Sequence, residues 1–214
     1  MESKLFTPVT FGPLTLRNRT IRSAAFESMC PGNAPSDMLL DYHRSVAAGG
    51  IGMTTVAYAA VTQSGLSFDR QLWMRPEIIP GLRRLTDAIH AEGAAAGIQL
   101  GHCGNMSHKS ICGCMPVGAS SGFNLYSPTF VRGLRADELP EMARAYGRSV
   151  NLAREAGFDS VEIHAGHGYL ISQFLSPSTN HRKDEFGGSL QNRMRFMDMV
   201  MDEVMKAAGS DMAV

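Results

Sequence analysis

The chain has 214 residues with 20 basic and 20 acidic side chains, so its formal net charge is zero. This balance excludes the strongly basic surface typical of nucleic-acid binding or of attachment to anionic membranes. Apolar residues make up 44% and charged residues 19%, and no apolar run approaches the ~20 residues of a membrane span. The first residues lack the pattern of a signal peptide, and there are only four cysteines. These features predict a cytoplasmic protein that binds neither nucleic acid nor membrane.

The first predicted element is a short hairpin over residues 6–16, which turns at Gly12 and Pro13 and would close one end of a barrel. A first strand is predicted within 18–25. One pattern then occurs four times: an alanine-rich helical stretch ends at glycine, and an apolar run follows. Glycine ends a helix because it adopts the left-handed conformation without penalty. Runs that are apolar on both faces are typical of strands buried in a parallel sheet. These runs are 51–61, 94–100, 158–164 and 212–214.

Helices are predicted between the strands, and the order of the elements indicates an α/β fold. The connections from strand to helix are long, above all 101–136, whereas those from helix to strand are short. This asymmetry favours a TIM (β/α)₈ barrel over a flavodoxin-like or other doubly wound sheet, since 23–30 has no glycine-rich phosphate loop. The predicted helices are 37–48, 78–92, 137–156 and 189–208, with Ser189 and Asp137 as starts.

The run at 212–214 is predicted to open a fifth strand, whereas a barrel has eight strands and typically ~250 residues. We therefore expect residues 1–214 to form the N-terminal part of a single barrel domain, with about four to five βα units and an N-terminal hairpin. Further chain or a second copy would complete it. Open edges of a parallel sheet favour self-association, which predicts a homo-oligomer.

Catalytic chemistry is predicted where the strand at 158–164 ends. His164, His167 and Tyr169 follow that strand and would lie on the active-site rim of a barrel. Two imidazoles on a tight turn can converge on one oxygen and stabilise negative charge there, and a neighbouring phenol can deliver a proton. An ordinary structural role for these side chains is one alternative. Zinc binding by Glu162, His164, His167 and His102 is another, which strand alternation disfavours because His167 lies beyond the strand.

The stretch 164–196, HAGHGYLISQFLSPSTNHRKDEFGGSLQNRMRF, closely resembles the old yellow enzyme family of FMN-dependent ene-reductases. The segments 14–19 (LTLRNR) and 97–102 (GIQLGH) resemble it as well, so the similarity covers nearly the whole chain. The resemblance implies a TIM barrel that holds FMN at its mouth. NAD(P)H reduces the flavin, which then passes hydride to the activated C=C bond of an enone. Cofactors of this kind perform the difficult chemistry while the protein orients them.

The resemblance also assigns roles to residues of this chain. His164 and His167 match the paired ligands of the substrate oxygen, and Tyr169 matches the proton donor. Gln99 matches the glutamine that bonds the flavin ring, as an amide with both donor and acceptor can. The remaining positions expected against the flavin are Ser23, Ala24, Ala25, Phe26 and Tyr58.

Several features depart from the family or stay open. Phe26 stands where members often carry Thr or Cys, so a packing role and a flavin-facing role are both open, and we expect Glu27 to face solvent. The resemblance implies that the FMN phosphate is bound after strands seven and eight, where barrels commonly bind phosphate, and that an arginine of the fifth strand lies near the flavin. We therefore expect the 214 residues alone to bind FMN poorly. We expect Arg182 and Asp184 to pin a loop, and Cys112 and Cys114 to be loop cysteines without a cofactor.

Three functional hypotheses follow from the sequence. The first is an FMN-dependent oxidoreductase that reduces α,β-unsaturated carbonyl compounds with NAD(P)H. The second is a non-catalytic half-barrel that self-associates. The third is a flavin-free barrel lyase or isomerase with His164 or His167 as its base.

Overall fold

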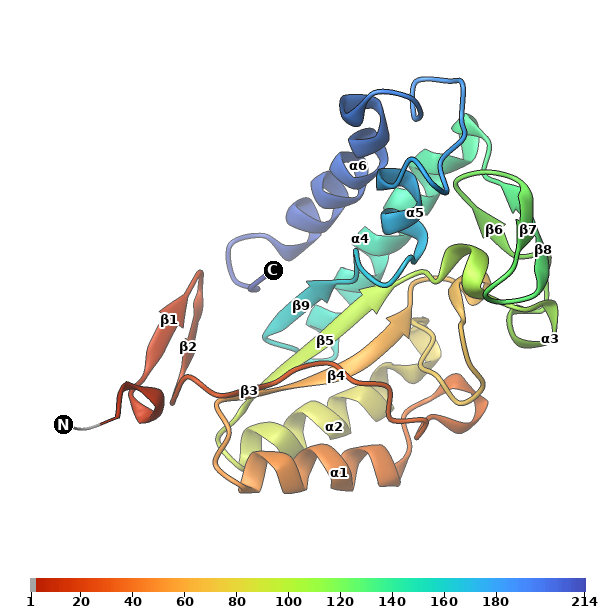
Figure 1. Cartoon of the computed structure of the whole chain (residues 1–214). Helices are drawn as coiled ribbons and strands as arrows, with labels where there is room; N and C mark the ends of the chain where they lie inside the picture. The colour runs from red at the N-terminus through yellow and green to blue at the C-terminus, as the bar shows by residue number, and fades with distance from the viewer. Residues whose placement is uncertain (1–2) are drawn as a thin grey trace.

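The computed structural model describes residues 3–214, and its centre is a parallel sheet with the strands in chain order (Figure 1). The strands are β3 (Ile21–Arg22), β4 (Met53–Ala60), β5 (Ala95–Gly101) and β9 (Ser160–Ile163). β4 is buried along its whole length, as predicted for a strand apolar on both faces. The sequential order within residues 3–214 differs from a flavodoxin-like sheet, in which the order reverses at a switch point.

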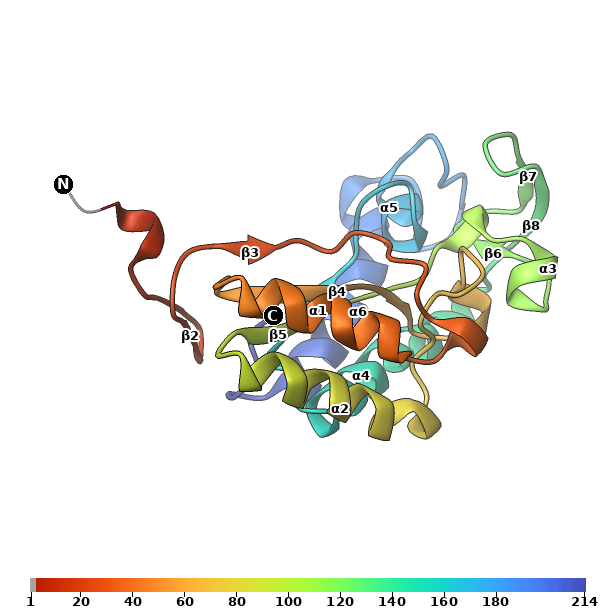
Figure 2. The same cartoon turned by 90° about the horizontal axis from the view of Figure 1, so that it is seen from below.

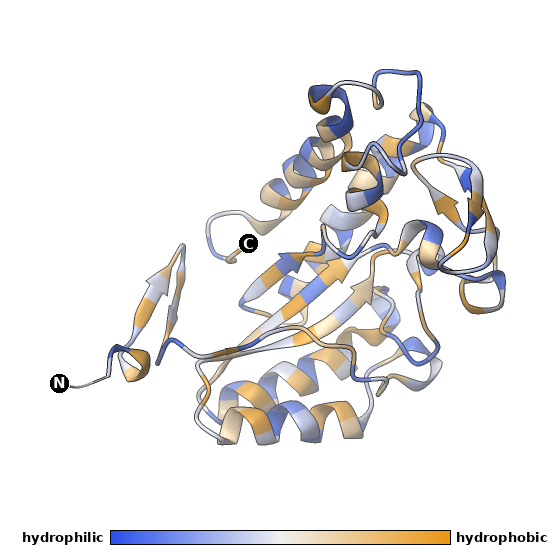
Figure 3. Ribbon diagram, in the orientation of Figure 1, coloured by the Kyte–Doolittle hydropathy of each residue, from blue (hydrophilic) through white to orange (hydrophobic). Residues whose placement is uncertain are grey.

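Four long helices cover the sheet, and each lies within two residues of its predicted bounds. α1 packs against α2, α2 against α4, and α4 against α6, so neighbours in the chain are neighbours in space. Figure 1 shows α1 and α2 beneath the strands, Figure 2 shows them side by side from below, and Figure 3 shows hydrophobic and hydrophilic residues alternating along them. The helices are α1 (Asp37–Ala48), α2 (Ile79–Ala91), α4 (Leu139–Glu155) and α6 (Leu190–Ala208).

The predicted start of α6 is confirmed, whereas that of α4 is not. Ser189 caps α6, since its side chain accepts a hydrogen bond from the backbone N–H of Asn192. The start of α4 differs from the prediction, because Glu138 rather than Asp137 accepts from the backbone N–H of Arg135 (2.7 Å). A short 3₁₀ helix, η6 (Ala136–Glu138), therefore precedes α4.

The predicted hairpin is confirmed as β1 (Val9–Phe11) paired with β2 (Leu14–Leu16), and it stands apart from the main sheet in Figures 1 and 2. Arg17, directly after it, donates to the backbone oxygens of Ala47, Ile51 and Glu92. These contacts tie the hairpin to the ends of α1 and α2. At the other edge of the sheet, Ala213 forms a parallel bridge with Ser160, where the opening of a further strand was predicted.

Two parts of the fold were not predicted. The segment 101–136, expected as a loop, forms a small sheet in which β8 (Thr129–Gly133) lies between β6 (Val117–Gly118) and β7 (Gly122–Asn124). It also carries α3 (Lys109–Cys112). A short helix, α5 (Leu170–Leu175), follows the predicted catalytic turn. Among residues 3–214, none of the helices combines the length and apolar composition needed to cross a bilayer.

Candidate functional site

The carboxyl ends of β4, β5 and β9 and the segment after β3 surround a cavity of about 220 Å³, here called the inner cavity. It lies at the edge of the sheet where parallel α/β folds bind ligands, since the strands end there and long loops follow. Its lining residues are Ala24, Ala25, Phe26, Ala57, Tyr58, Phe68, Gln99, His164, His167 and Tyr169.

A β-bulge shapes the wall that β4 contributes. The pairing of β4 with β5 shifts register between Val56 and Ala59, and the residues between them line the cavity. Bulges of this kind redirect side chains at strand ends next to active sites. The redirected Tyr58 is buried, and its hydroxyl donates to the backbone oxygen of Gly65 (2.8 Å). Burial raises the pKa of Tyr58 well above its usual value, so the side chain is a neutral wall.

His164 and His167 lie on the turn after β9 and are bonded to each other. Nδ1 of His167 lies 3.2 Å from Nε2 of His164, with the rings nearly perpendicular. The backbone N–H of Gly166 donates to Nδ1 of His164 (3.3 Å), so a neutral His164 carries its proton on Nε2 and donates to His167. His167 then keeps its own proton on Nε2. The expected meeting of the rings at one oxygen is therefore replaced here by a mutual hydrogen bond.

The backbone of this turn explains how His167 reaches the cavity. His167 has φ +55°, a left-handed conformation that is uncommon for any residue except glycine. Gly168 follows with φ +70°, which glycine adopts at no cost. These two residues reverse the chain and hold the exposed ring of His167 against the buried His164.

His164 and Tyr169 have pKa values shifted in opposite directions by the same cause. Burial lowers the pKa of His164, and nearby His167 lowers it further. Burial raises the pKa of Tyr169, although a hydrogen bond from Ser67 opposes this; the two hydroxyl oxygens lie 3.2 Å apart. The ring centres of His164 and Tyr169 lie 4.8 Å apart. The site therefore holds a neutral imidazole beside a protonated phenol at neutral pH.

The opposite wall is formed by small and amide side chains. Ala24, Ala25 and Ala57 leave the backbone accessible to a flat molecule, and the Gln99 side chain lies at one margin. Nε2 of Gln99 donates to the Glu162 carboxylate on the neighbouring strand. Gln99 is thus oriented by its partner while its amide retains donor and acceptor groups.

Phe26 has the packing role, whereas its role toward the flavin stays a prediction. Its ring stacks on that of Phe68 with centres 4.8 Å apart, and both rings line the inner cavity. Phe26 nevertheless remains 43% exposed. It therefore packs against a neighbour and faces the cavity at the same time.

The expectation that Glu27 faces solvent is wrong. Its carboxylate is 6% exposed and forms an ion pair with Arg22 (2.7 Å), while Nε2 of His43 lies 3.3 Å away. The backbone N–H of Ala57 donates to the same oxygen (3.3 Å). Burial of the carboxylate is stabilised because Arg22 pairs with it and the backbone N–H of Ala57 donates to it. Glu27 therefore links the segment after β3 to the bulge of β4 directly behind the inner cavity.

The structure brings together eight of the nine side chains predicted from the sequence. Ser23 is the exception, since it does not line the cavity. Sequence reasoning missed Ala57 and Phe68, and also Ser67, which orients Tyr169. Ser67 and Phe68 lie in the loop after β4, and loops that follow barrel strands often supply site residues. Their hydroxyl and aromatic side chains were therefore a signal that sequence reasoning had available.

The zinc alternative has no geometric support. His102 is fully buried, accepts from the backbone N–H of Gly104 (3.0 Å) and lies 3.0 Å from the Ser64 hydroxyl. Burial lowers the pKa of His102 to about 3, so it stays neutral. Between residues 3 and 214, no three His, Cys, Asp or Glu side chains are grouped as a metal site requires.

The loop-pinning role expected for Arg182 and Asp184 is confirmed. The Arg182 guanidinium is 8% exposed, forms an ion pair with Asp184 and donates to the backbone oxygens of Ala119 and Leu134. It therefore ties the loop after α5 to the small sheet. A Cβ at Gly187 would lie 2.3 Å from the backbone oxygen of Arg182, so only glycine fits there.

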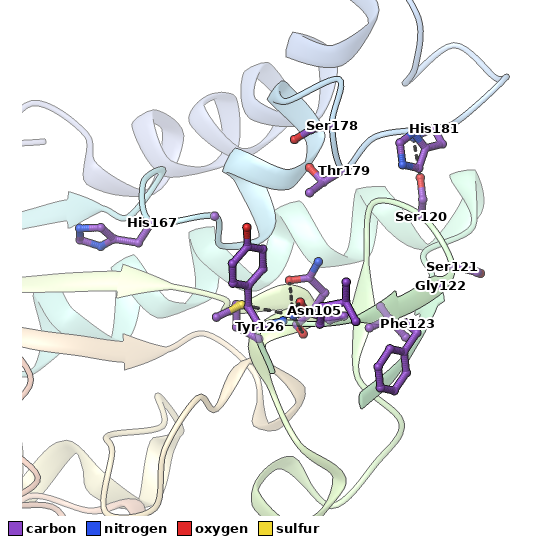
Figure 4. Close-up of a pocket in the computed structure, with 15 residues that line it drawn as sticks. Asn105, Ser120, Ser121, Gly122, Phe123, Tyr126, His167, Ser178, Thr179 and His181 are labelled. Atoms are coloured by element: carbon purple, nitrogen blue, oxygen red, sulfur yellow. Dashed lines mark hydrogen bonds between the residues drawn. The ribbon is translucent and has the colours of Figure 1, made fainter. Parts of the chain in front are cut away.

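A second cavity of about 550 Å³, the outer cavity, lies beside the first between the small sheet and the loop after α5 (Figure 4). Tyr126 extends from the β7–β8 connection toward Ser178 and Thr179 in this view. His167 lines both cavities, so its ring forms the boundary between them.

With this geometry in place, the chain was compared with known families. Residues 4–214 match the model of the NADH:flavin oxidoreductase / NADH oxidase family. The chain belongs to this family. The family includes the old yellow enzymes and uses FMN, with NAD(P)H as its reductant. The resemblance noted from the 164–196 stretch is therefore confirmed.

Among curated relatives, the chain is 42% identical to the 4,4'-dithiodibutanoate disulfide reductase of Rhodococcus erythropolis, over 98% of this chain and 52% of that protein. It is 37% identical to the NADPH dehydrogenase of Bacillus subtilis (strain 168), over 95% of this chain and 60% of that protein. The chain therefore spans about half to three fifths of the length of these two relatives.

Solved structures of the family superpose closely on the fold. An old yellow enzyme homologue from Zymomonas mobilis matches with a TM-score of 0.91 and 29% identity, over 99% of this chain and 62% of that one. Morphinone reductase in complex with tetrahydroNAD also matches with a TM-score of 0.91 and 29% identity, over 99% of this chain and 63% of that one. The parallel α/β architecture is thus that of the family.

The residues of the inner cavity fit the isoalloxazine ring of FMN. Ala24, Ala25 and Ala57 provide a floor without bulky side chains, and Gln99 presents an amide at its margin. A flat ring with donors and acceptors along one edge requires both properties. The inner cavity measures about 220 Å³, which is the scale of a ring system rather than of a whole nucleotide. The inner cavity therefore fits the isoalloxazine ring and not the whole FMN molecule.

Proposed function

We propose that the protein is an FMN-dependent oxidoreductase that takes hydride from NAD(P)H and reduces the C=C bond of α,β-unsaturated carbonyl compounds. In this proposal residues 1–214 form the N-terminal part of a single FMN-binding TIM barrel. The observation that carries the proposal is the grouping of His164, His167 and Tyr169 around one cavity at the carboxyl ends of the strands. Family membership supports it independently.

The residues would divide the work as follows. Ala24 and Ala25 would lie against the flavin ring and Gln99 would bond its edge. FMN, when bound, would supply the hydride that it has accepted from NAD(P)H. The carbonyl oxygen of the substrate would lie between the imidazoles and receive N–H donors from His164 and His167 in place of their mutual bond. These donors would stabilise the negative charge that develops on that oxygen.

Tyr169 would complete the reaction as the proton donor. Its raised pKa keeps the phenol protonated, and the Ser67 hydroxyl at 3.2 Å directs it. A general acid within hydrogen-bond reach of the carbon accelerates such steps by about 10²–10⁴-fold. Because His164 has a lowered pKa, its hydrogen bond to the oxygen would come from a neutral ring.

The test uses the full-length protein with NADH or NADPH and 2-cyclohexenone under anaerobic conditions. We expect oxidation of the nicotinamide to match the formation of cyclohexanone. Cyclohexanone itself, which lacks the C=C bond, is the matched control and should leave the nicotinamide unconsumed. Consumption at the same rate with and without the enone would refute the proposal.

An organic disulfide is a second candidate substrate, favoured by the 42% identity to the 4,4'-dithiodibutanoate disulfide reductase. Two electrons and two protons convert a disulfide into two thiols; Tyr169 would supply one proton and solvent the other. The same assay with 4,4'-dithiodibutanoate, followed by a thiol reagent, separates the two substrates. Release of two thiols for each nicotinamide oxidised, without enone turnover, would select the disulfide.

We further propose that the protein is cytoplasmic and that residues 1–214 alone form a homo-oligomer. Ile21 on β3, the first strand in the sheet order, is 48% exposed, and all four cysteines are free thiols. The β3 edge, which the remaining strands of a complete barrel would cover, is open in this part and promotes association, and free thiols suit a reducing compartment. Light scattering of residues 1–214 should give a mass above that of one chain, and Ile21→Lys should lower it.

A further inference from the structure

Two cysteines outside the inner cavity lie in direct contact. α3 ends at Cys112, and Gly113 follows with φ +74°, which reverses the chain and brings Cys114 back toward the helix end. The two sulfur atoms lie 3.7 Å apart. A disulfide bond is about 2.05 Å long, so a small rotation of the two side chains would bring the sulfurs to bonding distance.

The two thiols differ in their accessibility. Cys112 is 2% exposed and packs with Ala60 and Leu66, whereas Cys114 is partly exposed. A small reagent therefore reaches Cys114 first, and Cys112 is held behind it. This arrangement of one accessible and one shielded thiol suits a pair that closes on itself after the accessible thiol has reacted.

We propose that Cys112 and Cys114 form a redox-active dithiol site, which low-molecular-weight disulfides convert into an intramolecular disulfide. The Cys114 thiol loses its proton and attacks one sulfur of the disulfide R–S–S–R, which releases R–S⁻ and leaves a mixed disulfide. The Cys112 thiol then loses its proton and attacks the Cys114 sulfur, which releases the second R–S⁻. The two protons go to the two released thiolates. The pair is oxidised by two electrons, and the small disulfide is reduced to two thiols.

The other cysteines are not placed to compete. The Cys103 thiol is fully buried and directed at the backbone oxygen of Leu66 (3.3 Å), and burial raises its pKa to about 12. Burial raises the pKa of Cys30 to about 12 as well. Burial also raises the pKa of Cys114, helped by the adjacent Cys112, to about 11. Exchange at Cys114 should therefore quicken about tenfold per pH unit between pH 7 and 9, as the thiolate fraction rises.

The test uses the full-length protein, without NAD(P)H, and oxidised glutathione as the probe. Trypsin cleaves after Lys109 and Arg132, so both cysteines fall in the peptide 110–132. Cys30 and Cys103 fall in the separate peptides 23–44 and 85–109. We expect the oxidised peptide 110–132 to be lighter by about 2 Da and to resist alkylation until it is reduced. Because no reductant is present, the result does not depend on the proposed function.

Two variants complete the test. Cys114→Ser should prevent the internal disulfide, whereas Cys103→Ser should leave it unchanged; circular dichroism of each variant checks that it is folded. A peptide 110–132 that still takes two alkyl groups after oxidation would overturn the proposal. So would a cross-link between 110–132 and 85–109, since that would make Cys103 the partner.

Discussion

His90 and His164 lie at opposite ends of the main sheet, and their neighbours shift their pKa values in opposite directions. His90 on α2 lies 2.8 Å from the Asp159 carboxylate, which also accepts from the backbone N–H of Ala96 (2.7 Å). This hydrogen bond raises the pKa of His90, although partial burial opposes it. His164 instead meets another imidazole, and burial lowers its pKa. At the amino end of the sheet, the pair of His90 and Asp159 joins α2 to the start of β9. At the carboxyl end, the imidazole of His164 remains available as an uncharged donor to a ligand.

The largest expected effect comes from removing both imidazoles at the carboxyl end. His164→Ala combined with His167→Ala should weaken binding of a phenol-type ligand to the FMN-loaded, full-length protein by about 10²–10⁴-fold, because hydrogen bonds to an ionised oxygen contribute about 1.5–3 kcal/mol each. Calorimetric titration measures it. His90→Ala is the matched control and should leave the affinity unchanged. Equal affinity in the double variant would reject the paired role.

Removal of the phenol hydroxyl should act on one half-reaction only. In the full-length protein, Tyr169→Phe should slow alkene reduction by about 10²-fold, because a general acid is lost, and spare flavin reduction by NAD(P)H. Stopped-flow absorbance separates the two steps. Equal loss in both would contradict the proton-donor role and indicate a structural role for Tyr169.

The buried carboxylate behind the inner cavity should contribute to stability. Glu27→Gln should lower the free energy of unfolding by about 2 kcal/mol, because Arg22 loses its buried charged partner. Denaturant titration measures it. Asp41→Asn, which removes an exposed ion pair with Arg44, is the control and should change stability by less than about 0.5 kcal/mol. Equal effects of the two substitutions would show that Glu27 is not held as described.

The smallest expected effect comes from the contact between His90 and Asp159 at the amino end of the sheet. Because the folded-state pKa of His90 is raised, the stability from its contact with Asp159 is present below the unfolded pKa of about 6.5 and is lost as pH rises through the folded pKa. The coupling in a cycle of His90→Ala and Asp159→Ala should stay below about 1 kcal/mol at low pH and vanish at high pH. A coupling that is independent of pH would contradict this assignment.

His164 should show the opposite sign. Its folded-state pKa is lowered, so the stability that it contributes is present above pH about 6.5 and is lost as pH falls through the folded pKa. His164→Ala should therefore flatten the acid side of the profile of stability against pH, and His90→Ala the alkaline side. The same direction in both variants would show that the two ends do not differ.

The sequence predicted the repeated elements well because each depends on local signals. Glycine stops and doubly apolar runs placed α1, α2, β4 and β5 within two residues. The small sheet was missed because its strands have two to five residues each and pair only through tertiary contacts. Short strands of this kind carry little periodicity of their own.

The candidate site was predicted in its membership but not in its internal bonding. Eight of the nine side chains line the cavity. The place of His164, His167 and Tyr169 after a strand predicted these three, whereas the other five were expected only from the family resemblance. The burial of Glu27 depends on Arg22 and on the backbone N–H of Ala57, which lies on a separate strand, so no local sequence pattern predicts it. The bond between His164 and His167 depends on a left-handed residue that only the folded turn defines.

At His167, the residue type that would best stabilise the left-handed turn differs from the residue type that ligand recognition requires. A side chain with φ +55° costs about 1–3 kcal/mol unless the surroundings hold it there, and glycine would adopt the same angle freely. His167→Gly should therefore have a higher free energy of unfolding than His167→Ala, although neither variant has a side-chain donor for the two cavities. Selection for more stable variants of this protein would favour replacement of His167, and the gain in stability would remove the imidazole that lines both cavities.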